Sequence, residues 1–320
     1  MFKWEKKSQI WAPSLENKWA QEYGQNPNVL VLPDRLRIYF SSRKKMKEDN
    51  KYISYIFYVD VDKHDPSTVI AFEDKPVLNE TGKGEDNHFD EFGTMPGSLL
   101  WHGNNQEVWM YYVGWTRSAT QPYKWANGLA ISTDGGKSFV KKANGPILSK
   151  PYDYPYLQAC PRVLKLHDDK WVMWYASGTE WLDEGGRLNP IYVLMNAESS
   201  DGLNWALGNQ QTIPSVCNKE CQSSASVIEL NGTYHMFFSY RDVLPDQHGH
   251  KQYRVGYASS SDLIHWHRND ANAGIDVSSS GWDAEAVCYP HVVKVDDKIY
   301  MFYSGNQFGS AGFGYAQLIG

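Results

Sequence analysis

The sequence predicts an all-β protein, a five-bladed β-propeller with four antiparallel strands in each blade. Two observations predict it: a five-fold internal repeat, and a composition rich in aromatic residues and turn formers. The 320 residues include 13 Trp, 21 Tyr, 12 Phe, 26 Gly and 15 Pro, which suits many short strands joined by tight turns and disfavours a helical bundle. Repeated units that cannot bury their faces alone stack around an axis, so we expect residues 1–320 to form one propeller domain.

Each repeat opens with a short segment that predicts the innermost strand of a blade. The second residue of each segment is proline or alanine, at Pro27, Pro96, Pro161, Ala225 and Pro290. An aromatic second strand follows in every repeat, at residues 37–40, 109–112, 172–175, 235–238 and 300–303. Third strands are expected at residues 52–58, 128–132, 192–197, 253–258 and 312–316. Apolar, aromatic-rich runs of this length, separated by turn residues, are typical of strands that pack in a sheet.

The connection between the third and fourth strands carries a similar turn in three repeats. The segments Ser132–Phe139, Ser199–Trp205 and Ser260–Trp266 each place Asp two residues after the first Ser and end on an aromatic residue. An aspartate at this point accepts hydrogen bonds from the backbone of its own turn. We therefore expect tight turns whose final aromatic ring packs on the sheet.

The last repeat lacks a fourth strand of its own. It ends after residues 312–316, whereas the first residues of the chain, around Trp4, resemble the outer strands near Trp205 and Trp266. We expect the N-terminal segment to complete the fifth blade, because this closes the ring and removes an exposed sheet edge. Trp4 is then expected to pack between blades. The alternative is a frayed polar terminus.

The charge balance argues against polyanionic nucleic acid as a partner. Lys and Arg number 31 and Asp and Glu number 37, for a formal net charge of −6, so no overall basic field is expected. No segment approaches the roughly 18 apolar residues of a membrane span, and the start of the chain lacks the apolar core of a signal peptide. We therefore expect a soluble cytoplasmic protein with no membrane partner and no cofactor.

The four cysteines are too few for a disulfide scaffold in so long a chain. They stand at Cys160, Cys217, Cys221 and Cys288, and no two of them form a Cys-x-x-Cys pair. We therefore expect reduced thiols and no metal site.

Acidic residues recur just before the predicted innermost strands, at the mouth where these strands converge on the axis. Five residues before each repeat position stand Glu22, Glu91, Tyr156, Glu220 and Glu285, and Asp90 and Asp283 lie beside two of them. Paired carboxyl groups of different pKa are what glycosidic cleavage requires, since one protonates the leaving oxygen and the other activates water or attacks. The alternative is that these side chains lie in exposed turns and are only solvated.

Loops after the second strands carry aromatic and polar residues that suit a sugar. Sugar rings have apolar C–H faces flanked by hydroxyl groups, so aromatic rings beside hydrogen-bonding side chains bind them. Arg43 and Arg241 stand at equivalent strand ends and suit an anionic substituent such as a carboxylate or a phosphate. Alternatively, Arg43 pairs with a rim glutamate and the aromatic residues are packing plugs. The expected substrate-binding residues are Glu22, Asn26, Arg43, Trp115, Trp181, Tyr240, Arg241 and Asn306.

The repeats, the segment Ala197–Trp205 and the strand Tyr300–Gly305 resemble the five-bladed propeller glycosidases of families 43, 32, 68, 117 and 130. The likeness spans nearly the whole chain. It is greatest to uncharacterised family 43/32-like proteins of bacterial polysaccharide gene clusters, which share motifs like Gly281–Glu285 and Gly312–Ala316. The resemblance implies a propeller fold and a glycosidase or related glycosyl-transferring enzyme acting on a carbohydrate or polysaccharide precursor. Hydrolysis, phosphorolysis and transfer all remain open.

The resemblance implies catalytic positions, and the chain departs from some of them. The base of families 43 and 32 stands in an Asp-Pro pair, where this chain has Asn26-Pro27, and the equivalent position in the third repeat is Cys160. Glu220-Cys221 resembles the pair that holds the general acid of family 32, so Glu220 is predicted to be the acid. Asp90, Glu91, Asp283 or Glu285 is then predicted to replace the missing base. The competing hypothesis is a non-catalytic carbohydrate-binding propeller.

Overall fold

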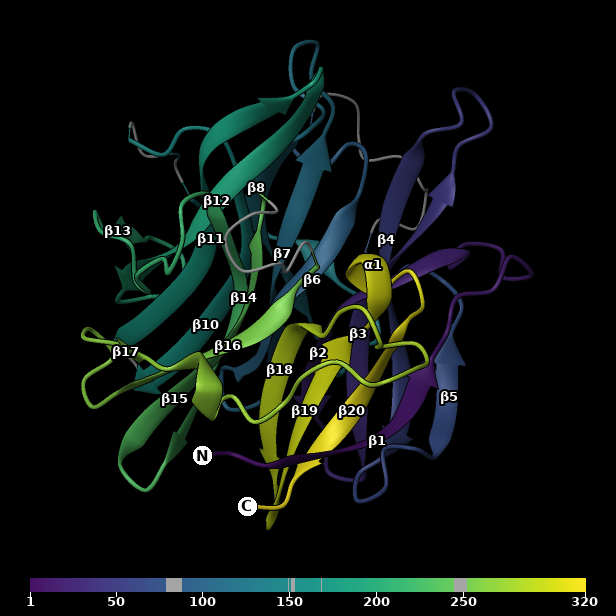
Figure 1. Ribbon diagram of the computed structural model, residues 1–320. Coiled ribbons are helices and arrows are strands. Elements are labelled where there is room, and N and C mark those ends of the chain that lie inside the picture. Colours follow the sequence, from purple (N-terminus) through teal and green to yellow (C-terminus); the bar gives the residue numbers. More distant parts are fainter. Residues whose placement is uncertain (79–87, 149, 151–152, 168, 245–251) are drawn as a thin grey trace.

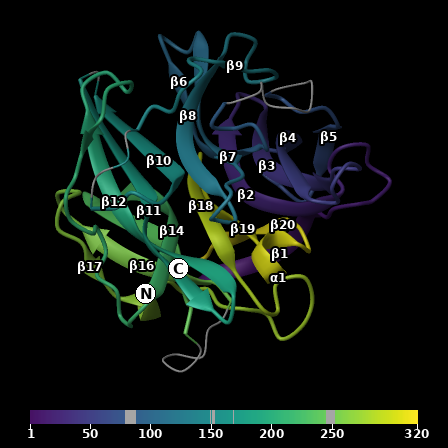
Figure 2. The same cartoon turned by 90° about the horizontal axis from the view of Figure 1, so that it is seen from above.

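The computed structural model consists of five four-stranded antiparallel sheets arranged as the blades of a ring (Figure 1). It describes residues 1–78, 88–148, 150, 153–167, 169–244 and 252–320. The fold predicted from the repeat is confirmed, with five blades of four strands each. Seen from above, the blades surround one central axis (Figure 2).

The strands take equivalent positions in every blade. Innermost are β2 (Glu22–Val31), β6 (Thr94–His102), β10 (Gln158–His167), β14 (Glu220–Leu230) and β18 (Cys288–Val295). Second are β3 (Arg35–Lys45), β7 (Glu107–Thr116), β11 (Lys170–Glu184), β15 (Thr233–Asp242) and β19 (Lys298–Ser304). Third are β4 (Tyr52–Asp62), β8 (Lys124–Ser132), β12 (Arg187–Ser199), β16 (Arg254–Ser260) and β20 (Phe313–Leu318). Outermost are β5 (Val69–Glu73), β9 (Val140–Lys141), β13 (Ala206–Leu207), β17 (His267–Arg268) and β1 (Trp4–Trp11).

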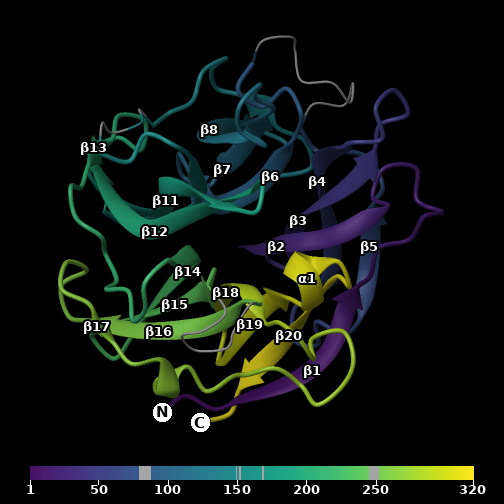
Figure 3. The same ribbon diagram turned by 45° about the horizontal axis from the view of Figure 1, so that its top comes forward.

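Two short helices lie outside the sheets. A 3-10 turn, η1, spans Asp270–Asn272, and α1 spans Asn306–Gly309 between β19 and β20. Helix α1 contacts β2, near the centre of the ring (Figure 3). Within the described ranges, no helix is long and apolar enough to span a bilayer.

The N-terminal segment completes the fifth blade, as predicted. Strand β1 pairs antiparallel with β20, with Trp4 opposite Leu318 and Trp11 opposite Phe313. The indole of Trp4 is buried against Phe237 of blade four, with ring centroids 5.6 Å apart, and its Nε1 donates to a backbone carbonyl. The two chain ends lie side by side in Figure 1.

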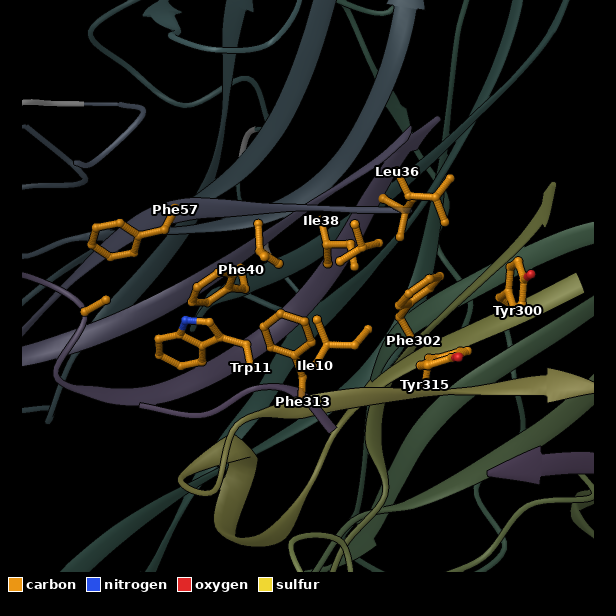
Figure 4. Packing of buried hydrophobic residues seen from close by; sticks show 14 of the residues in the cluster. Ile10, Trp11, Leu36, Ile38, Phe40, Phe57, Tyr300, Phe302, Phe313 and Tyr315 are labelled. Carbon is orange, nitrogen blue, oxygen red and sulfur yellow. The ribbon is translucent and has the colours of Figure 1, made fainter. Parts of the chain in front are cut away.

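Aromatic packing between neighbouring blades forms the cores. In the cluster between blades five and one, the ring of Trp11 of β1 lies tilted with its centroid 4.5 Å from that of Phe40 and stacks on Phe313, while Phe302 and Tyr315 pack beside them (Figure 4). Large rings bury much apolar area at low entropic cost. The aromatic-rich second strands therefore hold the ring together.

The predicted turns between third and fourth strands are confirmed. Oδ1 of Asp201 accepts from two backbone amides of its own turn, at 2.8 Å each. Asp134 and Asp262 make the equivalent bonds. The aromatic residues that end two of these turns, Phe139 and Trp266, are buried. These turns connect the third strands to the outermost strands. The ends at which the innermost strands begin are left free to form a site.

Candidate functional site

A cavity of about 610 Å³ opens at the mouth of the ring, where the innermost strands begin. All five blades contribute to it, and we call it the axial pocket. Strand ends supply Arg43, Arg241 and Tyr289, the β7–β8 loop supplies Tyr123, and the long β11–β12 hairpin supplies Arg187. Its other aromatic side chains are Tyr23, Trp125, Tyr192 and Phe308.

A second cavity of about 480 Å³ adjoins the axial pocket over blades one and two. The two cavities share Arg43, Tyr123 and Trp125. This flanking pocket also contacts Tyr52 and Trp115. The indole N–H of Trp115 donates to the hydroxyl of a buried serine at 2.7 Å, so its polar atom is satisfied within the protein and its ring is left to line the cavity.

The lining of the axial pocket carries cations and no carboxylate among the residues the structure describes. Its charged members are Arg43, Arg187 and Arg241. The guanidinium of Arg43 lies 4.7 Å from the ring centroid of Tyr23, and that of Arg241 lies 5.6 Å from the ring of Tyr253. In the described part of the chain, none of the three arginines lies within ion-pair distance of an acidic group. The pocket is therefore a site of uncompensated positive charge.

Arg241 is the most enclosed of these cations. Its Nε is buried, and no hydrogen-bond partner for that atom is found within the described ranges. Burial acts to lower the pKa of Arg241, but the neighbouring Tyr192, Cys221 and Tyr253 outweigh it and hold the pKa well above its usual value. The group stays charged at any accessible pH, and a buried charge is costly unless an anion meets it.

The phenols around the pocket are neutral at physiological pH. Burial raises the pKa of Tyr123 to about 12, and burial together with neighbouring groups raises the pKa values of Tyr192 and Tyr289 well above the usual value. Neutral phenols donate hydrogen bonds and present apolar faces. The pocket therefore combines fixed positive charge with aromatic faces.

Backbone bulges occur near the start of the innermost strands, at the mouth of the ring. Every innermost strand breaks register with its neighbour at this point. Four residues here have left-handed φ angles of 50–56°, a strained conformation of the kind that often marks functional sites; they are Asn26, Cys160, Ser224 and Tyr289. The equivalent residue in blade two is Met95. None of the five carries a carboxyl group; of these residues Tyr289 lines the axial pocket and Met95 lines the flanking pocket.

The side chain of Asn26 makes a hydrogen bond within the protein. Its Nδ2 donates to the carbonyl of Pro96, and its backbone N–H donates to Oγ of Ser304 at 3.2 Å. Asn26 is 7% exposed. It therefore links the innermost strands of two neighbouring blades at the mouth of the ring.

Two of the predicted catalytic aspartates lie in buried ion pairs within their own blades. Asp90 bonds Lys141 of the outermost strand β9 at 2.7 Å, and Asp283 bonds Lys6 of the outermost strand β1 at 2.7 Å. A hydroxyl of the second strand donates to each at 3.0 Å, from Tyr112 and Tyr303 respectively. Neither aspartate contacts the axial pocket. The repeated arrangement favours a structural role, in which the pair ties the entry loop to the blade edge.

Glu220 follows the same pattern in blade four. Its Oε1 bonds Nη1 of Arg268, on the outermost strand β17, at 2.7 Å and accepts from Gln222 at 2.7 Å. Its side chain is fully buried. It faces a separate cavity of about 330 Å³, beside Cys217 and Glu180, and does not line the axial pocket. Its role as general acid stays a prediction, and the ion pair with Arg268 favours a structural one.

The remaining predicted carboxylates lie apart from one another. Oε2 of Glu22 accepts from the hydroxyl of Tyr52 at 2.6 Å at the rim of the flanking pocket. Glu91 accepts from Thr116 at 3.4 Å. The backbone N–H of Glu285 donates to the side chain of Asn306 at 2.7 Å. Four of the five positions that share this repeat phase carry a carboxyl group, and none of these four residues lines the axial pocket.

The predicted binding residues divide into two groups. Arg43 and Arg241 line the axial pocket, and Trp115 lines the flanking pocket. Trp181 stands behind the mouth, where its ring contacts Tyr123 edge to face at 5.3 Å. Two others face elsewhere. The ring of Tyr240 lies 5.0 Å from the Arg268 guanidinium, and the side chain of Asn306 holds the loop at Gly281–Ala286.

Sequence reasoning missed the pocket residues Arg187 and Tyr192. The sequence signal that could have revealed them is the length of one hairpin. Strands β11 and β12 span 15 and 13 residues and pair as far as Glu184 and Arg187, which extends this hairpin beyond those of the other blades. Phe308 lies in α1, in the loop after the second strand of blade five, where Gln307 and Phe308 both have left-handed φ.

Comparison with known proteins finds relatives that match nearly the whole chain. It is 30% identical over 317 residues to "Uncharacterized protein MT1551" of Mycobacterium tuberculosis, covering 98% of this chain and 99% of that protein. The chain belongs to the family of this mycobacterial protein. A family model described as "Glycosyl hydrolases family 32 N-terminal domain" matches residues 224–317. "Sucrose-6-phosphate hydrolase" of Bacillus subtilis is 35% identical over 81 residues, which are 25% of this chain and 15% of that protein.

Solved structures share the fold. One titled "Glycoside hydrolase" superposes with a TM-score of 0.72 at 17% identity, covering 98% of this chain and 90% of that one. Another, from work on the GH130 family of mannoside phosphorylases, superposes with a TM-score of 0.70 at 15% identity, covering 99% and 94%. The resemblance to five-bladed propeller glycosidases is confirmed.

Proposed function

We propose that this chain is a glycosidase-type propeller whose axial pocket binds a carbohydrate that carries a negative charge. One observation carries the proposal: three arginines from three blades converge on an aromatic pocket that has no carboxylate in its described lining. Arginine binds carboxylate and phosphate oxygens through paired N–H donors. The aromatic rings supply faces for a sugar. One relative, the sucrose-6-phosphate hydrolase of Bacillus subtilis, is named for an anionic sugar, which agrees with this proposal.

Two forms of this function differ in chemistry. Hydrolysis by two carboxyl groups needs an acid and a base about 5–10 Å apart across the scissile bond. The sequence predicts Glu220, Asp90 and Asp283 as acid or base, but each is held in an ion pair away from the pocket. The described lining offers no carboxyl group to the ligand. This observation favours the second candidate, a propeller that binds its carbohydrate without cleaving it.

Calorimetric titration tests the binding step. We expect galacturonate, glucose 6-phosphate or sucrose 6-phosphate to bind, and the matched neutral sugars galactose, glucose and sucrose to bind at least about tenfold more weakly, because a charge-assisted pair is lost. Arg43→Gln and Arg241→Gln should each weaken binding of the anionic sugar. Arg35→Gln is the control, because Arg35 pairs with Asp34 and lies outside the pocket. Equal affinity for charged and neutral sugars would overturn the proposal.

The aromatic contribution is tested separately. Trp115→Ala removes a ring from the flanking pocket, whereas Trp181→Ala removes the support behind Tyr123. We expect both variants to bind the anionic sugar more weakly. Incubation of sucrose 6-phosphate, which has a glycosidic bond, with the wild-type protein, followed by product analysis, then separates the two forms. Release of glucose 6-phosphate and fructose supports hydrolysis, and binding without product supports the binding form.

A further inference from the structure

A further cavity lies on the β3–β4 hairpin of blade one, and we call it the lateral pocket. Its volume is about 390 Å³. Trp19 and Tyr55 supply its aromatic faces, with ring centroids 5.4 Å apart in an edge-to-face arrangement. Its charged lining residues are Lys18, Lys44, Lys45, Lys47 and Glu48. Like the axial pocket, it combines aromatic faces with an excess of positive charge.

The lysines of the lateral pocket repel one another. Nζ of Lys44 lies 3.6 Å from the ring centroid of Trp19, and Nζ of Lys18 lies 5.2 Å from the same centroid. Burial, together with the charges of Lys18 and Lys47, lowers the pKa of Lys44. An anion in this cavity would relieve that repulsion, since opposite charges favour the protonated form of each lysine.

The lateral pocket connects with the mouth through the ring of Tyr52. Nζ of Lys45, which lines the lateral pocket, lies 5.5 Å from the centroid of this ring, and the guanidinium of Arg43 lies 5.9 Å from it. Tyr52 itself lines the flanking pocket. Arg43 lines both the flanking and the axial pockets. Cations therefore follow one another from the axial pocket past Tyr52 to the lateral pocket, interrupted by the Glu22 carboxylate that accepts from the Tyr52 hydroxyl at 2.6 Å. We call this series of cations the track.

The charge of this track is opposite to that of the protein. The described linings of the three cavities contain nine of the 31 Lys and Arg residues and one of the 37 Asp and Glu residues. One of the nine, Arg117, is compensated by an ion pair with Asp49. In a chain with a net charge of −6, such a gathering of cations attracts an extended anion along the track.

We propose that the ligand is a polyanionic saccharide chain that lies along this track, with one charged sugar in the axial pocket and further charged sugars across the flanking and lateral pockets. The inference rests on the proposed function and extends it from a single charged sugar to a polymer. Aromatic faces recur in all three cavities, at Tyr123, Trp115 and Trp19, which suits successive sugar rings. The glycosidase-type fold favours a saccharide over a single-stranded nucleic acid, which is tested as an alternative.

Affinity as a function of ligand length tests this inference. We expect the dissociation constants of oligogalacturonates to fall by about tenfold or more from one residue to six, because each added carboxylate meets another cation. The gain should shrink as salt is added. In the variant Lys18→Gln/Lys44→Gln/Lys47→Gln, the monomer should bind as it does to the wild type, and the gain with length should be lost.

The control carries the same change of charge elsewhere on the surface. Lys142, Lys170 and Lys294 are exposed and line none of the three cavities, so their triple glutamine variant should keep the gain with length. Thermal unfolding and circular dichroism of all variants confirm that each is folded.

Each outcome has one meaning. Affinity that does not rise with length, or a gain that the lateral lysine variant retains, overturns the inference and leaves the proposed function intact. Lysine-dependent binding of the hexamer without binding of the monomer overturns the proposed function, and with it the placement of a charged sugar in the axial pocket. Tighter binding of an oligothymidylate than of a galacturonate chain with the same number of charges overturns the choice of a saccharide.

Discussion

The ion pair between Glu220 and Arg268 separates a structural role for the carboxylate from a catalytic one. Oε1 of Glu220 lies 2.7 Å from the guanidinium, and the side chains are 0% and 5% exposed. Removing one partner of such a buried pair costs about 3–5 kcal/mol. Asp270 also bonds Arg268 at 2.8 Å. Because Asp270 still compensates part of the Arg268 charge when Glu220 is replaced, we expect a cost at the lower end of this range, about 3 kcal/mol.

The cost converts into a shift of the unfolding midpoint. The entropy of unfolding is about 2.1 cal/mol/K per residue, which for 320 residues is about 0.7 kcal/mol/K. A loss of about 3 kcal/mol therefore lowers Tm by about 4 °C. We expect Glu220→Gln to show this loss at pH 7 by circular dichroism while it still binds the anionic sugar.

A double-mutant cycle isolates the pair. Glu220→Gln in a background of Arg268→Gln should cost much less than in the wild type, because the carboxylate has already lost its partner. If Glu220 is instead the general acid, Glu220→Gln lowers turnover by about a hundredfold or more with an unchanged Tm. That pattern would refute the structural interpretation.

Three further predictions concern the fold and its titrating groups. Trp4→Ala, or removal of residues 1–8, should destabilise the protein by about 3–5 kcal/mol, because Trp4 is buried between blades; an unchanged midpoint in thermal unfolding would contradict ring closure by β1. Burial acts to raise the pKa of Asp134, but hydrogen bonds within its own turn outweigh it and lower the pKa to about 2. The pKa of an aspartate in an unfolded chain is about 3.9. The stabilisation that Asp134 provides is therefore complete above about pH 5 and is lost as the pH falls through 4 to below 2. Asp134→Asn should cost about 1 kcal/mol at pH 7 after allowance for solvent screening and much less at pH 2, and equal costs in acid and neutral melts would refute this. Burial and the hydrogen bond to Asp242 raise the pKa of Cys217 to about 12, so iodoacetamide should alkylate this thiol slowly at pH 8; Asp242→Asn should speed alkylation by about tenfold per unit of restored pKa, and identical rates by mass spectrometry would count against it.

The fold was predictable because its signal is local and repeated. The start of the innermost strand differs little from one blade to the next, at Pro27, Pro96, Pro161, Ala225 and Pro290. A pattern that would be weak in one segment predicts the fold strongly when it recurs five times at a nearly constant spacing. The N-terminal strand was found for the same reason, since Trp4 occupies the place in its blade that Trp266 occupies in another. Such patterns determine which segments form strands and how many blades close the ring.

The site was only partly predictable, because convergence of side chains is not a periodic property. The repeat phase placed Glu220, Asp90 and Asp283 near the mouth, but it carried no information on their partners, Arg268, Lys141 and Lys6. Those partners lie on outermost strands, and in the case of Lys6 on a strand from the other end of the chain. A carboxylate and a cation pair when the fold brings them together, whatever their phase in the repeat.

The distribution of charge likewise depends partly on the sequence and partly on the tertiary structure. By itself the sequence determined that the chain is acidic overall and that its strands form a propeller. The tertiary structure alone decided that Arg43, Arg187 and Arg241, separated by long stretches of sequence, meet in one pocket, and that four lysines gather beside it. The physical reason is that strand formation depends on neighbours along the chain, whereas the field in a pocket depends on charges that are neighbours only in space.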